Sequence, residues 1–405
     1  MSTIGQTAVV LAGGGARGAY EAGALATLLP ALEQRGERPR MFIGTSAGAI
    51  NAVLFGSIAH LPAHEAAQVA RDVWSSIYRK DVVSPILHSG IKAGLQYMGQ
   101  MLGISNHLPS ILNAHPLAQT LAERMNWRDL HENIRTGKHL DLVAVSATSC
   151  RSGRSVIFFE RHEPEGFTQA NYRDDTRAID YMATQLNPEH VMASAAIPVL
   201  FPPVHVARPS QAAGWYLDGG VRMNAPIKPA LVLGAEKLLI VASDPLETSP
   251  GMEVGTNIPD VYDAVSHMLK AALADRMVED VHTLRKMNAM LQHARELKPG
   301  CSASERPYRI VPWIFVGPRH SSHLGKMAEI VFQRNYGQLR WWHRHWDFPV
   351  LHQLIQGKGQ HRGELMSYLF FHHEYMQEAF NLGQRDAERI LRNSESAGLP
   401  WRTHL

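Results

Sequence analysis

The chain has 405 residues, enough for one large α/β domain or for two modest ones. Hydrophobic residues make up 45% of it and charged residues 19%, a composition typical of a folded globular protein, which excludes general disorder. The 40 basic and 37 acidic residues give a formal net charge of +3, too balanced for an electrostatic footprint on nucleic acid, so we expect no nucleic-acid partner.

Two strand–helix units open the chain. Thr7–Ala12 is apolar and β-branched and predicts a strand, followed by the glycine-rich turn Gly13–Gly18 and a helical pattern over 19–36. A second unit combines a short strand over Arg40–Ile43 with a helix of small residues over Ala47–Phe55.

Further strands follow down to about residue 250. Leu140–Ser149 and Ser155–Glu160 are predicted to pair as a hairpin, Trp215–Leu217 is a strand that ends at Asp218, and Lys237–Ser243 is a buried strand. Strands that alternate with helices predict an α/β fold with a mostly parallel sheet covered on both faces. Ligands bind such sheets at the carboxyl ends of strands.

The alternation of strands and helices ends near residue 257, where long helical patterns begin. We predict a main α/β domain over 1–256 and a mainly helical C-terminal extension over 257–405, packed on that domain. Within the extension, Tyr308–Val316 is a candidate strand for the main sheet.

The segment Gly44-Thr45-Ser46-Ala47-Gly48 matches G-x-S-x-G between a predicted strand and a predicted helix. In that context the pattern indicates a nucleophile elbow, with Gly44 and Gly48 permitting the sharp turn that exposes the Ser46 hydroxyl. The same letters also fit a glycine-rich turn with an incidental serine.

The turn over Gly13–Gly18 presents several backbone N–H groups at the start of a helix, an arrangement that binds negative charge. In an acyl-transfer enzyme it would form the oxyanion hole. The predicted oxyanion-hole residues are Gly13, Gly14, Gly15, Ala16, Arg17 and Gly18.

The same turn fits the dinucleotide fingerprint G-x-G-x-x-G, with Glu33 at the spacing of its ribose-binding acid. Glu33 lies inside a predicted helix, whereas the fingerprint requires its acidic residue at the end of a second strand. A dinucleotide-dependent oxidoreductase nevertheless stays open as an alternative.

Asp218-Gly219-Gly220 follows the strand at Trp215–Leu217. Asp-Gly is a common turn dipeptide, so a plain turn is one interpretation. A buried carboxylate beside Ser46 would instead accept the hydroxyl proton, its basicity raised by desolvation.

Taken in order, GGGARG, GTSAG and DGG resemble the patatin-like phospholipase family, and ASAAIP at Ala193–Pro198 is similar to the helix end before its aspartate strand. Ala12 stands where the family commonly has an acidic residue or serine. The resemblance covers about the first 245 residues and implies a three-layer α/β/α fold.

By the same resemblance, Ser46 is the nucleophile and Asp218 the base of a dyad that forms an acyl-enzyme on lipid esters. It implies neither cofactor nor metal. The substrate would be a phospholipid or another acyl lipid. A catalytically idle lipid-binding protein is the second alternative.

The sequence also bears on location. Two cysteines, Cys150 and Cys301, fit a reducing compartment, and the N-terminus lacks the basic region of a secretory signal. The methionine-rich stretch 81–112 suits an acyl-chain channel or a cap, and equally a segment that packs on the core. Three tryptophans among basic residues at 340–348 suit an interfacial anchor, and also a buried helix or loop. We expect a cytoplasmic protein with candidate peripheral membrane contact.

Overall fold

The structure is a computed structural model of the chain. It describes residues 6–82, 115–163, 173–174, 177–198, 200–246, 276–297, 309–320, 322–336, 362–392 and 399–403. Nearly all of the methionine-rich stretch (residues 83–112) and the whole tryptophan-rich stretch 340–348 lie outside these ranges.

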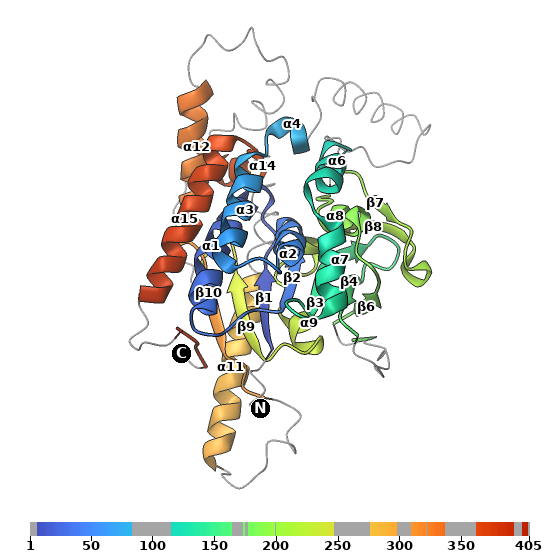
Figure 1. The fold of residues 1–405 in the computed structure, drawn as a ribbon, viewed down its shortest axis with the longest axis vertical. Helices are drawn as coiled ribbons and strands as arrows, with labels where there is room; N and C mark the ends of the chain where they lie inside the picture. The colour runs from blue at the N-terminus through green and yellow to red at the C-terminus, as the bar shows by residue number, and fades with distance from the viewer. Residues whose placement is uncertain are drawn as a thin grey trace, which may run out of the picture.

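A ten-stranded sheet with the order β10-β9-β1-β2-β3-β4-β6-β5 forms the centre of the molecule, and β8 joins β3 and β7 (Figure 1). The strands are β1 (Thr7–Leu11), β2 (Met41–Thr45), β3 (Leu142–Ser149), β4 (Ser155–Arg161), β5 (Arg173–Asp174), β6 (Ile179–Ala183), β7 (Val204–Val206), β8 (Gly214–Asp218), β9 (Lys237–Val241) and β10 (Trp313–Val316). Neighbouring strands from β10 to β3 run parallel. The predicted mostly parallel sheet is confirmed, as is the hairpin of β3 with β4.

Helices cover both faces of this sheet. They are α1 (Gly18–Glu33), α2 (Ala47–Ser57), α3 (Ala63–Ser75), α4 (Arg79–Val82), α6 (His115–Arg124), α7 (Trp127–Thr136), α8 (Pro188–Ser194), α9 (Ile227–Val232), α11 (Arg276–Leu297), α12 (Ser322–Tyr336), α14 (Arg362–Leu369) and α15 (His373–Arg392). In the described part of the chain, no helix combines the length and apolarity needed to cross a bilayer.

Strand β1 shows how the sheet separates two hydrophobic cores. Successive side chains of a strand point to opposite faces. Val9 and Leu11 belong to the core that includes side chains of α1, α2, α3 and α15. Ala8 and Val10 belong to the core that includes side chains of α9 and α11. The fold is therefore a three-layer α/β/α arrangement.

The C-terminal part of the chain contributes to the sheet and to both helical layers. Strand β10 pairs in parallel with β9, from Trp313 opposite Leu238 to Val316 opposite Val241. The expected return of this segment to the main sheet is confirmed, with a strand shorter than predicted. Helix α15 packs along α1, and the Tyr20 hydroxyl donates to the Asp386 carboxylate at 3.0 Å.

Candidate active site

Ser46 lies between the end of β2 and the start of α2, with φ 55° and ψ −121°. A non-glycine residue in such a conformation stores about 1–3 kcal/mol of strain, and this sharp turn is the one that a nucleophile elbow requires. The flanking glycines are required by space. A Cβ on Gly44 would lie 2.0 Å from the Gly48 carbonyl oxygen, and one on Gly48 would lie 2.5 Å from that of Leu11. GTSAG thus forms the predicted strand-to-helix turn.

Asp218 approaches Ser46 because β2 and β8 share one edge of β3. Thr45, the last residue of β2, pairs with Ser146, and Asp218 pairs with the next residue, Ala147. Asp218 ends its strand as predicted, but β8 runs antiparallel to β3. A short antiparallel strand beyond the end of β2 points its carboxyl end back toward that of β2, so the two ends meet.

The carboxyl group of Asp218 is buried, with the residue 1% exposed. Its Oδ1 accepts a hydrogen bond from the Gly220 amide at 2.7 Å, whereas Oδ2 has no hydrogen-bond partner of normal geometry among the described residues. Burial raises the pKa of Asp218 to about 7, although the Ser46 hydroxyl and the Gly220 amide each lower it. Asp218 therefore changes charge near neutral pH, as a general base should.

The glycine loop, Gly13–Gly18, lies beside Ser46, since Gly15 and Ser46 line the same pocket. Three of its amides already have acceptors. Gly13 donates to Asn224 Oδ1 at 2.8 Å, Arg17 to the Gly14 carbonyl at 3.0 Å, and Gly18 to the carbonyls of Ala16 and Gly15. The amides of Gly14, Gly15 and Ala16 have no acceptor within the part of the chain that the structure describes. These three are the N–H groups left for a ligand.

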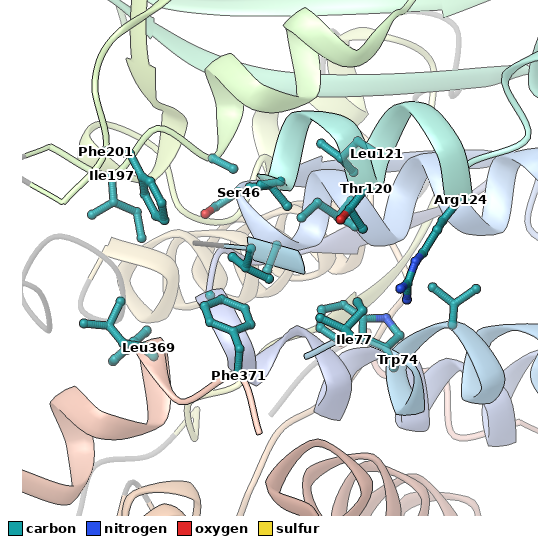
Figure 2. Close-up of a pocket in the computed structure, with 18 of the residues that line it drawn as sticks. Ser46, Trp74, Ile77, Thr120, Leu121, Arg124, Ile197, Phe201, Leu369 and Phe371 are labelled. Atoms are coloured by element: carbon teal, nitrogen blue, oxygen red, sulfur yellow. The ribbon is translucent and has the colours of Figure 1, made fainter. Parts of the chain in front are cut away.

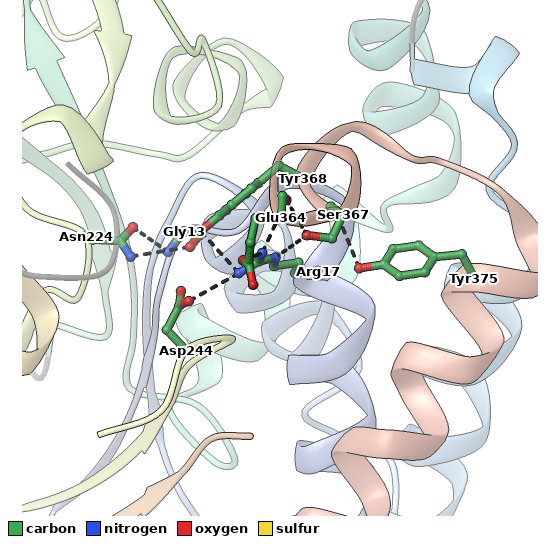
Figure 3. A network of polar contacts seen from close by, with 8 residues as sticks. All are labelled: Gly13, Arg17, Asn224, Asp244, Glu364, Ser367, Tyr368 and Tyr375. Atoms are coloured by element: carbon green, nitrogen blue, oxygen red, sulfur yellow. Dashed lines mark hydrogen bonds and ion pairs between the residues drawn. The ribbon is translucent and has the colours of Figure 1, made fainter. Parts of the chain in front are cut away.

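The Arg17 side chain does not line the pocket. It is fully buried and forms ion pairs with Asp244 at 3.2 Å and Glu364 at 2.6 Å. Figure 3 shows Asp244 on one side of its guanidinium and α14 on the other. In this position the Arg17 side chain holds the loop and does not point its charge into the pocket.

Two buried polar residues of the site were not predicted from the sequence. The Asn224 side chain binds both backbone polar groups of Gly13: its Oδ1 accepts from the Gly13 amide, and its Nδ2 donates to the Gly13 carbonyl at 3.3 Å. Ser194 accepts from the Ser46 amide at 2.9 Å and donates to the Ser146 carbonyl at 2.6 Å. A polar residue inside an apolar segment is the signal that could have pointed to Ser194, which lies within ASAAIP.

An apolar pocket opens at Ser46 and extends between α3 and α6 (Figure 2). The pocket contains about 710 Å³ of space not filled by atoms, part of which is open to solvent. Its lining includes Trp74 and Ile77 near α3, Leu117 and Leu121 of α6, and Ile197 and Phe371. A hydroxyl at the edge of an apolar pocket suits an ester with a hydrocarbon chain.

Glu33 does not occupy the position that a dinucleotide-binding site requires for its ribose-binding acidic residue. Glu33 is the last residue of α1 rather than the end of a second strand, and its carboxylate accepts from the Ala63 amide at 2.9 Å and pairs with Arg38 at 3.3 Å. Among the residues with described side chains, no group of three or more His, Cys, Asp or Glu is arranged to hold a metal ion.

The chain is similar to known proteins in sequence and in structure. The model of a protein family described as patatin-like phospholipase matches residues 9–231, more than half of the chain. Among solved structures, the chain is similar to VipD from Legionella pneumophila, with a TM-score of 0.30 and 14% sequence identity. That alignment covers 77% of this chain and 61% of VipD, so the chain spans less than two thirds of that protein's length. No curated protein sequence matches the chain.

Proposed function

Since the chain belongs to the patatin-like phospholipase family, we propose that it is a serine-dependent lipid acyl hydrolase with Ser46 as nucleophile and Asp218 as general base. One observation carries the proposal. Ser46 sits in a strained turn at an apolar pocket, beside a buried carboxylate and beside loop amides that have no acceptor among the described residues. A packing role explains neither the strain nor the unpartnered carboxylate oxygen.

In the first half of the reaction, the Ser46 hydroxyl attacks the ester carbonyl carbon while the Asp218 carboxylate takes its proton. The carbonyl oxygen becomes an oxyanion, which accepts hydrogen bonds from the free amides of Gly14, Gly15 and Ala16. The tetrahedral intermediate then expels the alcohol, which receives the proton from Asp218. The acyl group remains on Ser46.

In the second half, a water molecule attacks the acyl-Ser46 carbonyl and Asp218 takes the water proton. Collapse of the intermediate releases the fatty acid and returns the proton to Ser46. The pocket holds the hydrocarbon chain, so a phospholipid or another acyl lipid is the proposed substrate, presented by a membrane surface.

The test measures fatty acid release by the purified protein from phosphatidylglycerol–phosphatidylcholine vesicles and from a chromogenic butyrate ester. A fluorophosphonate probe and peptide mass mapping should place a covalent adduct on Ser46. Binding to vesicles without ester cleavage or adduct would instead support the catalytically idle lipid-binding alternative. A bound chromophore with nicotinamide or flavin absorbance would support the dinucleotide alternative.

The pH dependence of the rate is a direct consequence of the Asp218 environment. Only the deprotonated carboxylate accepts the Ser46 proton, and its pKa is about 7. We expect kcat/KM for the butyrate ester to fall about tenfold per pH unit below pH 7 and to level off above it. A rate that stays constant from pH 5 to pH 8, with the fold intact by circular dichroism, would contradict this role of Asp218.

The pocket between α3 and α6 should set the preferred chain length. Leu117 is 8% exposed and lines the pocket, so Leu117→Trp narrows it. We expect kcat/KM to fall about tenfold or more for a hexadecanoyl ester and less than threefold for the butyrate ester, as expected when lost methylene contacts are worth about 1–3 kcal/mol.

The matched control is Gln119→Trp, which adds the same side chain at an exposed position of the same helix. It should leave both rates unchanged. An equal loss on both esters in Leu117→Trp would mean that this end of the pocket does not hold the acyl chain.

A further inference from the structure

The guanidinium of Arg17 joins the glycine loop to α14 through a complete set of hydrogen bonds (Figure 3). Nε donates to Ser367 Oγ at 2.8 Å, Nη1 to Asp244 Oδ1 and the Tyr368 hydroxyl at 3.2 Å each, and Nη2 to Glu364 Oε2 at 2.6 Å and to its carbonyl at 3.3 Å. All five N–H groups of the side chain are used. Lysine, a point charge, could not reproduce this fork.

Helix α14 also touches the loop backbone directly. Gly15 has φ +55°, and a Cβ on it would lie 2.3 Å from the Tyr368 carbonyl oxygen. Only glycine fits there without moving α14 or the loop. The loop and the end of α14 are therefore in backbone contact beside the Arg17 guanidinium.

The same end of α14 forms part of the pocket wall. Tyr368 and Leu369 line the pocket, and so does Phe371 in the turn that follows. The Tyr375 hydroxyl of α15 donates to the Ser367 carbonyl at 3.2 Å and ties this turn to the longer helix. Residues 362–375 thus contact the glycine loop and the pocket at once.

We propose that Arg17 is a positioning residue that fixes the free amides of the glycine loop by anchoring the loop to α14, so that the C-terminal segment completes the active site. Arg17 ends the short turn that carries Gly14, Gly15 and Ala16, and its own amide donates to the Gly14 carbonyl. Fixing its side chain therefore fixes the direction of those three N–H groups. The inference rests on the proposed function.

Its charge supports an anchoring role. Burial alone would lower the pKa of Arg17, but Tyr368, Asp244 and Glu364 outweigh that effect and raise it, so the side chain stays charged. The guanidinium also lies 3.9 Å from the centre of the Tyr368 ring. Each of these contacts reaches a partner more than 200 residues away in the chain.

The test replaces one anchor at a time. Glu364→Gln keeps the shape and removes one charge, Ser367→Ala removes one neutral acceptor, and Arg17→Lys keeps the charge and loses the fork. The matched control is Arg71→Gln. Arg71 contacts α15 through Asn381 and Gln384 and does not touch the glycine loop.

For Glu364→Gln and Arg17→Lys we expect kcat on the butyrate ester to fall about ten- to hundredfold with KM within about twofold, because misplaced donors weaken the transition state more than the bound substrate. For Ser367→Ala, kcat on the same ester should fall about threefold to tenfold. A butyl trifluoromethyl ketone, which forms an oxyanion on Ser46, should lose affinity by the same factor as kcat. The corresponding alcohol should not.

Three results would overturn the inference. The first is that the variants lose thermal stability but keep the wild-type kcat, when kcat is divided by the amount of protein that the fluorophosphonate labels at Ser46. The second is loss of ketone and alcohol affinity in equal measure. The third is an equal loss of kcat in Arg71→Gln. A wild type with no Ser46 adduct would show instead that the proposed function has failed, and this inference would fall with it.

Discussion

Ser46→Ala is expected to lower the rate of ester hydrolysis by about 10⁴-fold or more, because the reaction then has no nucleophile and no acyl-enzyme. The fluorophosphonate adduct should disappear with the activity. Any remaining rate over water would come from the loop amides and the pocket alone. The measurement is fatty acid release from vesicles, with the butyrate ester as a second substrate.

The control for this variant is Ser57→Ala. Ser57 is also buried and is the last residue of α2, the helix that follows Ser46. Its hydroxyl donates to the Leu54 carbonyl at 2.7 Å, and it does not line the pocket. It should keep the full rate. Activity that survives Ser46→Ala would overturn the dyad, whatever the behaviour of the control.

Asp218→Asn is expected to lower kcat by about 10³- to 10⁴-fold, since an amide accepts no proton from Ser46 and general-base catalysis is lost. Asparagine keeps the size of the side chain and its carbonyl oxygen for the Gly220 amide. Slow labelling of Ser46 by the fluorophosphonate should persist. The rate that remains should no longer fall between pH 8 and pH 6.

The same variant should gain stability relative to the wild type as the pH rises. The pKa of Asp218 is raised from its ordinary 3.8 to about 7, so the folded state keeps a proton that the unfolded state has lost. The stability that this group contributes is full below pH 4 and lost as the pH rises to 7. Asparagine does not titrate, so the variant escapes this loss. Between pH 4 and pH 8, its free energy of unfolding should rise relative to that of the wild type by up to about 4 kcal/mol.

Urea unfolding of both proteins at those two pH values measures this shift. A stability difference that is independent of pH would mean that Asp218 is ionised in the folded state without cost. Loss of activity together with loss of stability at pH 8 would point to a structural role rather than a catalytic one.

Local patterns were enough to predict the turn at Ser46 and the end of a strand at Asp218. GTSAG between a strand and a helix indicates an elbow because only a tight turn needs glycine on both sides of a serine. Asp218 was predicted as the end of a strand from the run before it. Both features depend on a few consecutive residues, for which sequence carries direct information.

Features that depend on pairing between distant segments could not be predicted in this way. The antiparallel direction of β8 follows from its place on the edge of β3 beyond β2. Asn224 lies 211 residues from the Gly13 that it holds, and Glu364 lies 347 residues from Arg17. No periodicity links such residues, so neither the loop contacts nor the part of α14 in the pocket could be predicted.

The order of the site along the chain has a consequence for protein synthesis. The ribosome makes the glycine loop and Ser46 more than 300 residues before α14. A nascent chain therefore carries Ser46, the proposed nucleophile, long before the α14 partners of Arg17 exist. If the loop needs those partners, hydrolysis begins only after α14 has been made, and nascent chains that lack α14 leave the lipids around them intact.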